Sequence, residues 1–368
     1  MRILFLGDYS NMHACLAAEL RLRGHQVTVV SDAGGYQHTQ CDVMLERSPG
    51  VRGALRYLND IFRLSAEWRG YDVVQLINPH FLKLKPGKLS YFFNMLRRRN
   101  GSLFLTLAGN DHHFVKQCVK GSIFPYSEFR VGSAPTPFAL SNPKREQNWL
   151  AREVADYSKM VYDNIDGALS ALYEYDIAAR DILGDRLAYG GIPIDCIRLR
   201  EQPWDDSIPL RLLIGKRPGM EIQKGLERIE KAARRLECEM PERVRVSVVG
   251  GLSLEDYRRE VAGSHIVLDQ LYAMSPATNA LEAMAMGRVA ASGAGQRFYD
   301  FIGESELHPI VPLNPHTDIF AVLRSLAENP GQLRELAQQG HAFVEKHNSA
   351  SAVASRFENH WRKILDNK

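Results

Sequence analysis

The sequence has few cysteines, no long apolar run and almost no excess of charge of one sign. Its five cysteines among 368 residues are odd in number, widely spaced and never in a Cys-x-x-Cys pair. A disulfide framework and a zinc ribbon are therefore disfavoured, and reduced thiols in a cytoplasmic protein are expected. No uninterrupted apolar run approaches the ~18 residues needed to cross a membrane, so we expect a soluble chain.

The charges are nearly balanced, with 46 Lys and Arg against 43 Asp and Glu, a net charge of +3. This balance disfavours a disordered chain, and with no supporting motif we expect no nucleic-acid partner. A Gly-x-Gly-x-x-Gly fingerprint is also missing after the first apolar segment, where the chain has Gly7-Asp8-Tyr9-Ser10-Asn11. That absence argues against dinucleotide binding here. Ser10 or Asn11 is expected to cap the helix that follows.

What the chain does have is a regular alternation of short apolar segments with amphipathic ones. This pattern is typical of parallel strands joined by helices that cover both faces of a sheet. It stops at residues 201–209, which contain two prolines and three acids, and then begins again. We predict an α/β protein of two Rossmann-like, doubly wound parallel-sheet domains facing a cleft. Ligands are expected beyond the carboxyl ends of the strands. One helix is predicted over residues 147–161.

The first chemical motif follows the predicted strand 210–214 and runs from Gly215 to Gly225. Lys216, Arg217 and Lys224 are placed just before a predicted helix. The planar fork of Arg and the point charge of Lys suit a diphosphate, and a helix N-terminus adds backbone donors. The alternative is an exposed, solvated basic loop.

The second motif is the segment 272–287, where small residues and hydroxyls precede a helix of Ala and Met. Ser275, Thr278 and Asn279 are predicted to cap this helix and to direct its N–H groups at a phosphate. Glu282 lies inside the apolar helix and would be costly if buried without a partner. That partner is a pair of sugar hydroxyls in one interpretation, and an Arg or simple exposure in the other. Gly250 and Gly251 end a further predicted strand, and for that reason they are also predicted to bind the ligand.

Together the two motifs resemble the donor domain of glycosyltransferase family 4, whose members have the GT-B fold. That family has a strand, then Gly-Arg, then Lys-Gly opening a helix, as Gly215 to Arg217 and Lys224-Gly225 do here. It later has Leu-Glu-Ala-Met-Ala-x-Gly, matched by Leu281 to Gly287. Segments 71–76, 166–171 and 190–195 are also similar to family strands.

The resemblance implies a retaining, metal-independent glycosyltransferase with no resident cofactor. Arg217 and Lys224 would neutralise the departing diphosphate of a nucleotide-sugar of the UDP or GDP type, a charge effect that is usually the largest catalytic term. Glu282 would accept hydrogen bonds from the ribose. The acceptor would be a glycan or a lipid-linked glycan. The expected domains are residues 1–204, an N-terminal acceptor-side domain, and residues 205–349, a donor domain. The helix 350–368 would pack back on the N-terminal domain.

The chain departs from the family pattern at several positions. The family has a second Glu eight residues before the position of Glu282, where this chain has Met274. Ala108 stands where the family often has His, and Asp111 and His112 are expected to substitute as acceptor-side catalytic groups. The alternative to a catalytic role is that His112 and His113 are simply a pair of surface histidines in a loop at a strand end. A metal site is disfavoured, because adjacent residues point apart. Two other functions stay open: a non-catalytic GT-B nucleotide-binding or partner protein, and a nucleotide-sugar epimerase.

A basic, aromatic segment lies between the predicted strands at 71–77 and 102–107. It combines Tyr91, Phe92 and Phe93 with six cations: Lys83, Lys85, Lys88, Arg97, Arg98 and Arg99. Such a segment can rest on an anionic bilayer, which would make the protein peripheral on the inner face of the membrane. The preferred interpretation is plainer: a helix with a packed apolar face and a solvated basic end.

Overall fold

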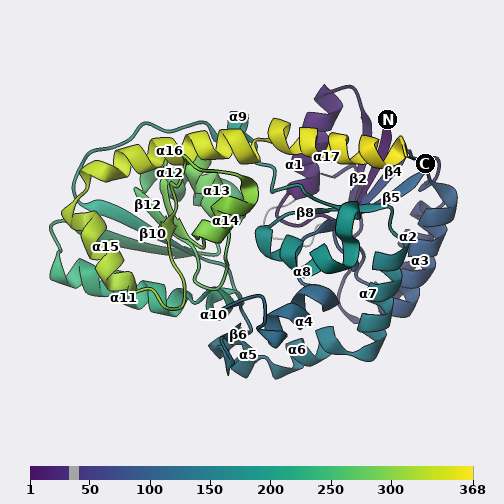
Figure 1. The fold of residues 1–368 in the computed structure, drawn as a ribbon, viewed down its shortest axis with the longest axis horizontal. Helices are drawn as coiled ribbons and strands as arrows, with labels where there is room; N and C mark the ends of the chain where they lie inside the picture. Colours follow the sequence, from purple (N-terminus) through teal and green to yellow (C-terminus); the bar gives the residue numbers. More distant parts are fainter. Residues whose placement is uncertain (33–40, 368) are drawn as a thin grey trace. The chain divides into compact units, whose positions relative to one another are not determined.

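The computed structural model describes residues 1–32 and 41–367, and its contacts divide the chain into two compact units (Figure 1). Unit 1 contains Met1–Lys116, Gln147–Pro193 and Ala350–Lys368, and unit 2 contains Gln117–Glu146 and Ile194–Ser349. The expected N-terminal domain, 1–204, thus includes two segments, 117–146 and 194–204, whose contacts group them with unit 2.

Unit 1 is built on a seven-stranded sheet in the order β3-β2-β1-β4-β5-β8-β9, with every pair parallel. The strands are β1 (Arg2–Leu6), β2 (Gln26–Ser31), β3 (Val43–Met44), β4 (Val73–Leu76), β5 (Ser102–Leu107), β8 (Gly167–Ser170) and β9 (Leu187–Tyr189). The helices are α1 (Met12–Leu22), α2 (Gly50–Leu64), α3 (Pro86–Arg99), α7 (Arg152–Asn164), α8 (Tyr173–Leu183) and α17 (Ala350–Leu365), with a 3-10 turn at Gly184–Arg186.

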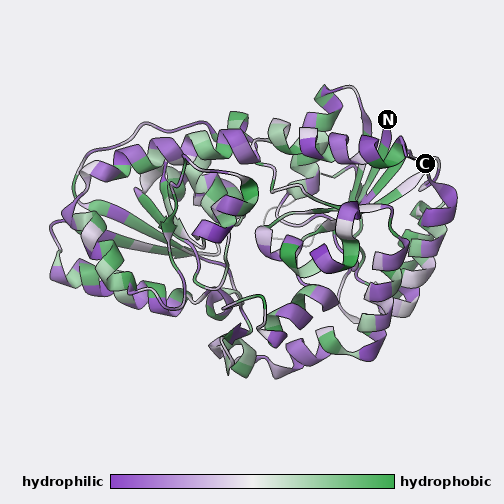
Figure 2. Cartoon of the chain, viewed as in Figure 1, coloured by the Kyte–Doolittle hydropathy of each residue, from purple (hydrophilic) through white to green (hydrophobic). Residues whose placement is uncertain are grey.

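The two faces of this sheet are covered by different helices, because successive residues of a strand point to opposite sides. Ile3 and Phe5 of β1 belong to a core shared with α1 and α17. Leu4 and Leu6 belong to a second core shared with α2, α3 and α7. Both faces are therefore apolar, which explains the continuous hydrophobic runs of the strands, green in Figure 2.

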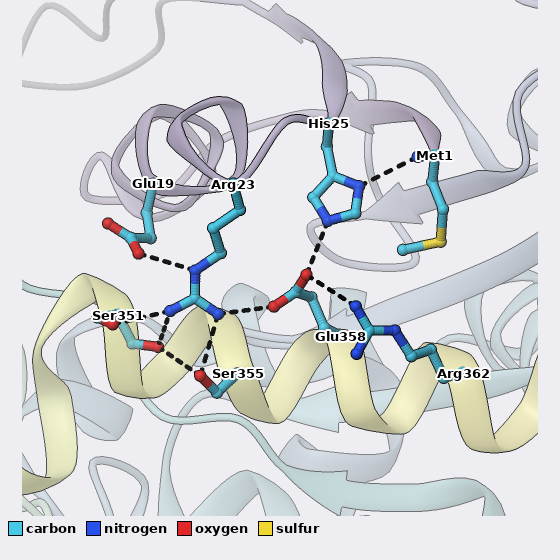
Figure 3. Close-up of polar contacts among 8 residues, drawn as sticks. All are labelled: Met1, Glu19, Arg23, His25, Ser351, Ser355, Glu358 and Arg362. Carbon is cyan, nitrogen blue, oxygen red and sulfur yellow. Dashed lines mark hydrogen bonds and ion pairs between the residues drawn. The ribbon is translucent and has the colours of Figure 1, made fainter.

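Helix α17 is attached to unit 1 by buried polar contacts as well as by its apolar face (Figure 3). Glu358 accepts from Arg23 at 2.6 Å and pairs with His25 at 2.7 Å. Burial raises the pKa of Glu358, but hydrogen bonds from His25 and Arg23 prevail and hold it below its ordinary value. Arg23 also donates to the carbonyl of Ser351 at 2.7 Å. These contacts join the end of α1 and the start of β2 to the C-terminal helix.

The N-terminus of α1 is capped differently from the expectation. Asn11 occupies the N-cap position in a left-handed conformation and makes no side-chain capping bond. Asp8, buried just after β1, accepts instead from the backbone N–H groups of His13 and Ala14, at 3.1 Å each. The predicted position of the cap, Asn11, is confirmed, but its side chain makes no capping bond. The turn brings the carboxylate of Asp8 under the helix end instead, where it accepts from the first N–H groups.

The burial of Asp8 makes the stability of unit 1 depend on pH. Burial raises the pKa of Asp8 from 3.8 to about 7, against the opposing effect of the N–H groups. The protonated Asp8 therefore contributes fully to the free energy of unfolding below the ordinary pKa of 3.8, and this contribution is lost as the pH rises through about 7. We expect the free energy of unfolding to fall by about 3 kcal/mol between about pH 5 and pH 8. Urea unfolding followed by circular dichroism measures this change. An Asp8→Asn variant with the same pH slope would contradict the assignment.

Unit 2 has a five-stranded parallel sheet in the order β11-β10-β12-β13-β14. Its strands are β10 (Leu210–Lys216), β11 (Val244–Gly250), β12 (Ile266–Leu268), β13 (Val289–Ser292) and β14 (Val311–Pro312). Its helices are α9 (Cys196–Leu199), α10 (Glu221–Lys224), α11 (Leu226–Glu239), α12 (Leu254–Gly263), α13 (Thr278–Ala285), α14 (Gln296–Ile302), α15 (Ile319–Glu328) and α16 (Gly331–Asn348). The predicted pair of parallel-sheet α/β domains is confirmed.

The proline-rich part of the chain forms short elements: α4 (His112–Lys120), β6 (Arg130–Val131), β7 (Ala134–Pro135), α5 (Pro137–Ser141) and α6 (Pro143–Leu150). The prediction of one helix over 147–161 was wrong. The structure has two helices, α6 and α7, separated at Ala151, which is the N-cap of α7 with φ −58° and ψ 142°. None of the helices in the described part of the chain is both long and apolar enough to cross a bilayer.

Candidate functional site

The centre of the candidate site in unit 2 is the buried carboxylate of Asp269, which follows β12. It pairs with the ammonium of Lys224 at 2.7 Å and accepts from the amide of Asn279 and the hydroxyl of Ser292, each at 3.0 Å. The side chain of Asp269 is fully buried, whereas that of Lys224 is 23% exposed. One carboxylate therefore connects the end of α10, the first turn of α13 and the end of β13, and leaves the lysine at the surface.

Tyr257 of α12 extends this network to the end of β10. Its hydroxyl donates to the side-chain oxygen of Asn279 at 2.6 Å. A Cβ atom added to Gly215 would lie 2.5 Å from the same hydroxyl. The glycine expected near a phosphate thus allows Tyr257 to lie close over the strand end.

The three cations of the first motif are placed differently from one another. Lys216, the last residue of β10, pairs with Glu230 at 2.6 Å, and Lys224 pairs with Asp269. Arg217 is exposed in the turn after β10, and no ion pair to it is found among the described residues. The structure therefore has two basic side chains held by acids and one open to solvent at the carboxyl edge of the sheet.

Glu282 of α13 has the arginine partner that the sequence left as an alternative. Its carboxylate accepts from Arg258 of α12 at 2.7 Å, and the two side chains are only 13% and 17% exposed. The pair satisfies the requirement that a buried charge be matched. The pair places this carboxylate in the middle of α13, the helix whose first turn contains Asn279.

The start of α13 differs from the expected cap. Ala277 is the N-cap residue and Thr278 is the first residue of the helix. The amide of Asn279 is directed to Asp269 and Tyr257, so its predicted capping role was wrong. Ser275 is fully buried before the helix, and Met274 is 7% exposed. Gly250 and Gly251 are exposed at the end of β11.

The predicted acceptor-side residues lie in unit 1, after β5. Asp111 accepts from the N–H of Phe114 at 2.8 Å, in the first turn of α4, and from the hydroxyl of Tyr162 at 2.5 Å. The Nδ1 atom of His112 lies 3.0 Å from the carbonyl of Trp149. Because a carbonyl can only accept, we assign the ring proton to Nδ1, which leaves the lone pair on Nε2.

His113 lies against the same tyrosine, with ring centroids 4.3 Å apart, and its Nε2 is buried without a partner. Burial lowers the pKa of His113, and the nearby His112 and Lys116 act in the same direction, although Asp111 acts to raise it. Within residues 1–32 and 41–367, no group of three or more His, Cys, Asp or Glu is arranged to hold a metal ion.

Sequence reasoning missed Asp269, Tyr257 and Arg258. A signal for Asp269 was present, because an acid directly after a short apolar strand lies where ligand-binding groups gather. Tyr257 and Arg258 had none, since their partners Asn279 and Glu282 are 22 and 24 residues away in the chain.

No model of a known protein family matches this sequence, and no curated protein does. Solved structures do. Sucrose-phosphate synthase from Thermosynechococcus elongatus is 15% identical with a TM-score of 0.67, and each chain covers all of the other. HepE from Anabaena, solved with UDP and glucose, is 14% identical with a TM-score of 0.60, covering 99% of this chain and 100% of its own.

A putative UDP-N-acetylglucosamine 2-epimerase from Listeria monocytogenes is 13% identical with a TM-score of 0.55, covering 100% of this chain and 97% of its own. Matches at this identity establish the fold. The chain has the GT-B fold of two Rossmann-like domains, as predicted.

Proposed function

We propose that this protein is a glycosyltransferase of the family 4 type that takes its sugar from a UDP-sugar and retains the anomeric configuration. The observation that carries the proposal is the placement of Lys224 and Arg217 beside the carboxyl end of β10, one held by Asp269 and the other open. HepE was solved with UDP and with UDP-glucose, which favours uridine as the base.

In the proposed mechanism, negative charge grows on the diphosphate as the bond to the sugar breaks. Lys224 and Arg217 stabilise that charge, and because they are in place beforehand the reaction has little reorganisation to complete. The N–H groups at the start of α13 add a partial positive charge near the same edge. These cations do the work that a divalent metal does in other transferases, so the proposal requires no metal.

The proposed donor site is lined by eight further residues: Gly215, Lys216, Gly250, Gly251, Ser275, Thr278, Asn279 and Glu282. For the acceptor we propose a glycan or lipid-linked glycan, with His112 as the group that takes its proton. The Trp149 carbonyl holds the Nδ1 proton, so Nε2 carries the lone pair that a base needs. Asp111 positions this segment through its bonds to Phe114 and Tyr162.

A calorimetric titration with a panel of nucleoside diphosphates tests the donor site. We expect UDP to bind, and Arg217→Ala to weaken binding by about 2 kcal/mol, roughly thirtyfold, because a charged hydrogen bond is lost. The matched control is Arg243→Ala, an exposed arginine at the amino end of β11, which should bind UDP as the wild type does. A wild-type protein that binds no nucleotide would refute the proposal.

The epimerase is the second candidate, favoured by the likeness to the Listeria protein. An epimerase converts a UDP-sugar with no acceptor present, whereas a transferase at most releases UDP slowly to water. A non-catalytic relative, consistent with Met274 in place of an acid, would bind UDP and do neither. Incubation with UDP-sugars, followed by separation of sugar nucleotides and UDP, distinguishes the three.

A further inference from the structure

Helix α2 exposes a continuous apolar stripe. Val51, Leu55, Leu58 and Phe62, which we call the α2 stripe, are spaced i, i+4, i+7 and i+11 and therefore lie along one side of the helix. Val51 is 77% exposed, Leu55 62% and Phe62 49%. The fully buried residues of this helix are Tyr57 and Ile61, and Leu58 is half-buried against the same core. Three members of the α2 stripe, Val51, Leu55 and Phe62, are thus apolar surface that unit 1 leaves exposed.

The α2 stripe continues onto helix α3 through aromatic contacts. The ring of Phe62 lies 5.7 Å from that of Tyr91, which is 52% exposed, and 5.1 Å from that of the buried Phe92. Figure 1 shows the two helices adjacent at the edge of unit 1. Of the aromatic residues 91–93, only Tyr91 is therefore available to a partner, since Phe92 and Phe93 belong to the core.

A second stripe, beside the first on α2, is basic. Arg52, Arg56 and Arg63 follow the apolar residues by one position each and are exposed. Asp60 approaches Arg56 and Arg63 only to 3.9 Å. Residues 46–99 carry eleven Lys or Arg against four Asp or Glu, a surplus of seven where the whole chain has three. The segment that contains α2 and α3 therefore carries a larger positive surplus than the whole chain.

We propose that α2 and the adjoining face of α3 bind the surface of an anionic lipid bilayer. The α2 stripe would enter the boundary between headgroups and acyl chains, and the arginines would contact the anionic headgroups. Tyr91 has an apolar ring and a polar hydroxyl, which suit that boundary. A second copy of this chain is a poorer occupant, because it would oppose two surfaces of the same sign.

Co-sedimentation with vesicles tests this surface. Wild-type protein should pellet with phosphatidylcholine mixed with phosphatidylglycerol, and far less with phosphatidylcholine alone. High salt should release it, because screening weakens the electrostatic attraction. Arg52→Glu together with Arg56→Glu should lower the partition coefficient by about tenfold or more. The matched control is Arg152→Glu, a 94% exposed arginine on α7, with wild-type binding expected.

Insertion of the α2 stripe is tested separately from charge. Leu55→Cys, labelled with a polarity-sensitive fluorophore, should shift its emission to the blue on anionic vesicles. The same label at Leu22→Cys, an 82% exposed leucine of α1, should not shift. Equal binding by wild type and the double Arg variant overturns the proposal. So does a blue shift that needs no lipid but grows with protein concentration, which would indicate self-association. Neither readout depends on nucleotide binding.

Discussion

Replacing Lys224 by Ala is expected to weaken UDP binding by at least thirtyfold and to slow UDP release from a UDP-sugar by about a hundredfold, as removal of a preorganised charge does in other sites. The same change should destabilise unit 2 by about 3 kcal/mol, because it leaves the buried carboxylate of Asp269 without its cation. Calorimetric titration measures the first effect, and urea unfolding measures the second.

A second substitution separates the two effects. Lys224→Ala combined with Asp269→Asn removes the unpaired buried charge, so much of the lost stability should return while UDP binding stays weak. An asparagine at position 269 keeps one acceptor oxygen for the amide of Asn279, and its NH2 group can donate to the hydroxyl of Ser292, which can accept. If the double variant recovers nucleotide binding as well, Lys224 acts only on stability and the proposed role at the diphosphate is wrong.

The second large effect is expected at Trp361 of α17. Trp361→Ala should cost unit 1 about 4 kcal/mol, because it removes the largest fully buried side chain of the core formed with α1. The indole packs near Phe5, Phe104 and Phe357 and donates to the side-chain oxygen of Gln75 at 2.9 Å. Gln75 in turn donates to Thr106, so its oxygen would lose the donor of a buried hydrogen bond.

Trp361→Phe is the matched control, because it keeps most of the packing and loses the hydrogen bond. We expect it to cost about 1.5 kcal/mol, clearly less than the alanine variant. Thermal unfolding followed by circular dichroism and by intrinsic fluorescence gives both values. An alanine variant as stable as the wild type would mean that α17 contributes little to unit 1.

Elements whose signal lies in neighbouring residues were predicted correctly, whereas features that depend on residues distant in the chain were not. The longer strands were recognised from their own residues, because strands buried on both faces need continuous apolar runs. The two-residue strands β3 and β14 had no predicted counterpart. Helix α2 had no predicted counterpart. Its sequence contains two glycines and three arginines, and only two of its residues, Tyr57 and Ile61, are fully buried. The capping bonds of α1 were assigned to Ser10 or Asn11 but are made by Asp8, which reaches the helix through the bend of the turn.

The site shows the same division. Glu282 was recognised as a carboxylate that needed a partner, from one charge on an apolar helix. That the partner is Arg258 depends on how α12 packs beside α13. Lys224 was recognised as a cation near a strand end, but its holder Asp269 lies 45 residues further along the chain.

The sequence by itself determined two parallel-sheet domains and the strand-end loops that carry the candidate donor residues. These features depend on the period of apolar residues and on short motifs, which act within a few positions. Only the tertiary structure decided which charges are paired, as Lys224 is with Asp269. It also decided which helix covers each face of a sheet: Trp361 of α17 bonds to Gln75 of β4, 286 residues away in the chain. Such pairings arise when distant segments pack, and no local spacing specifies them.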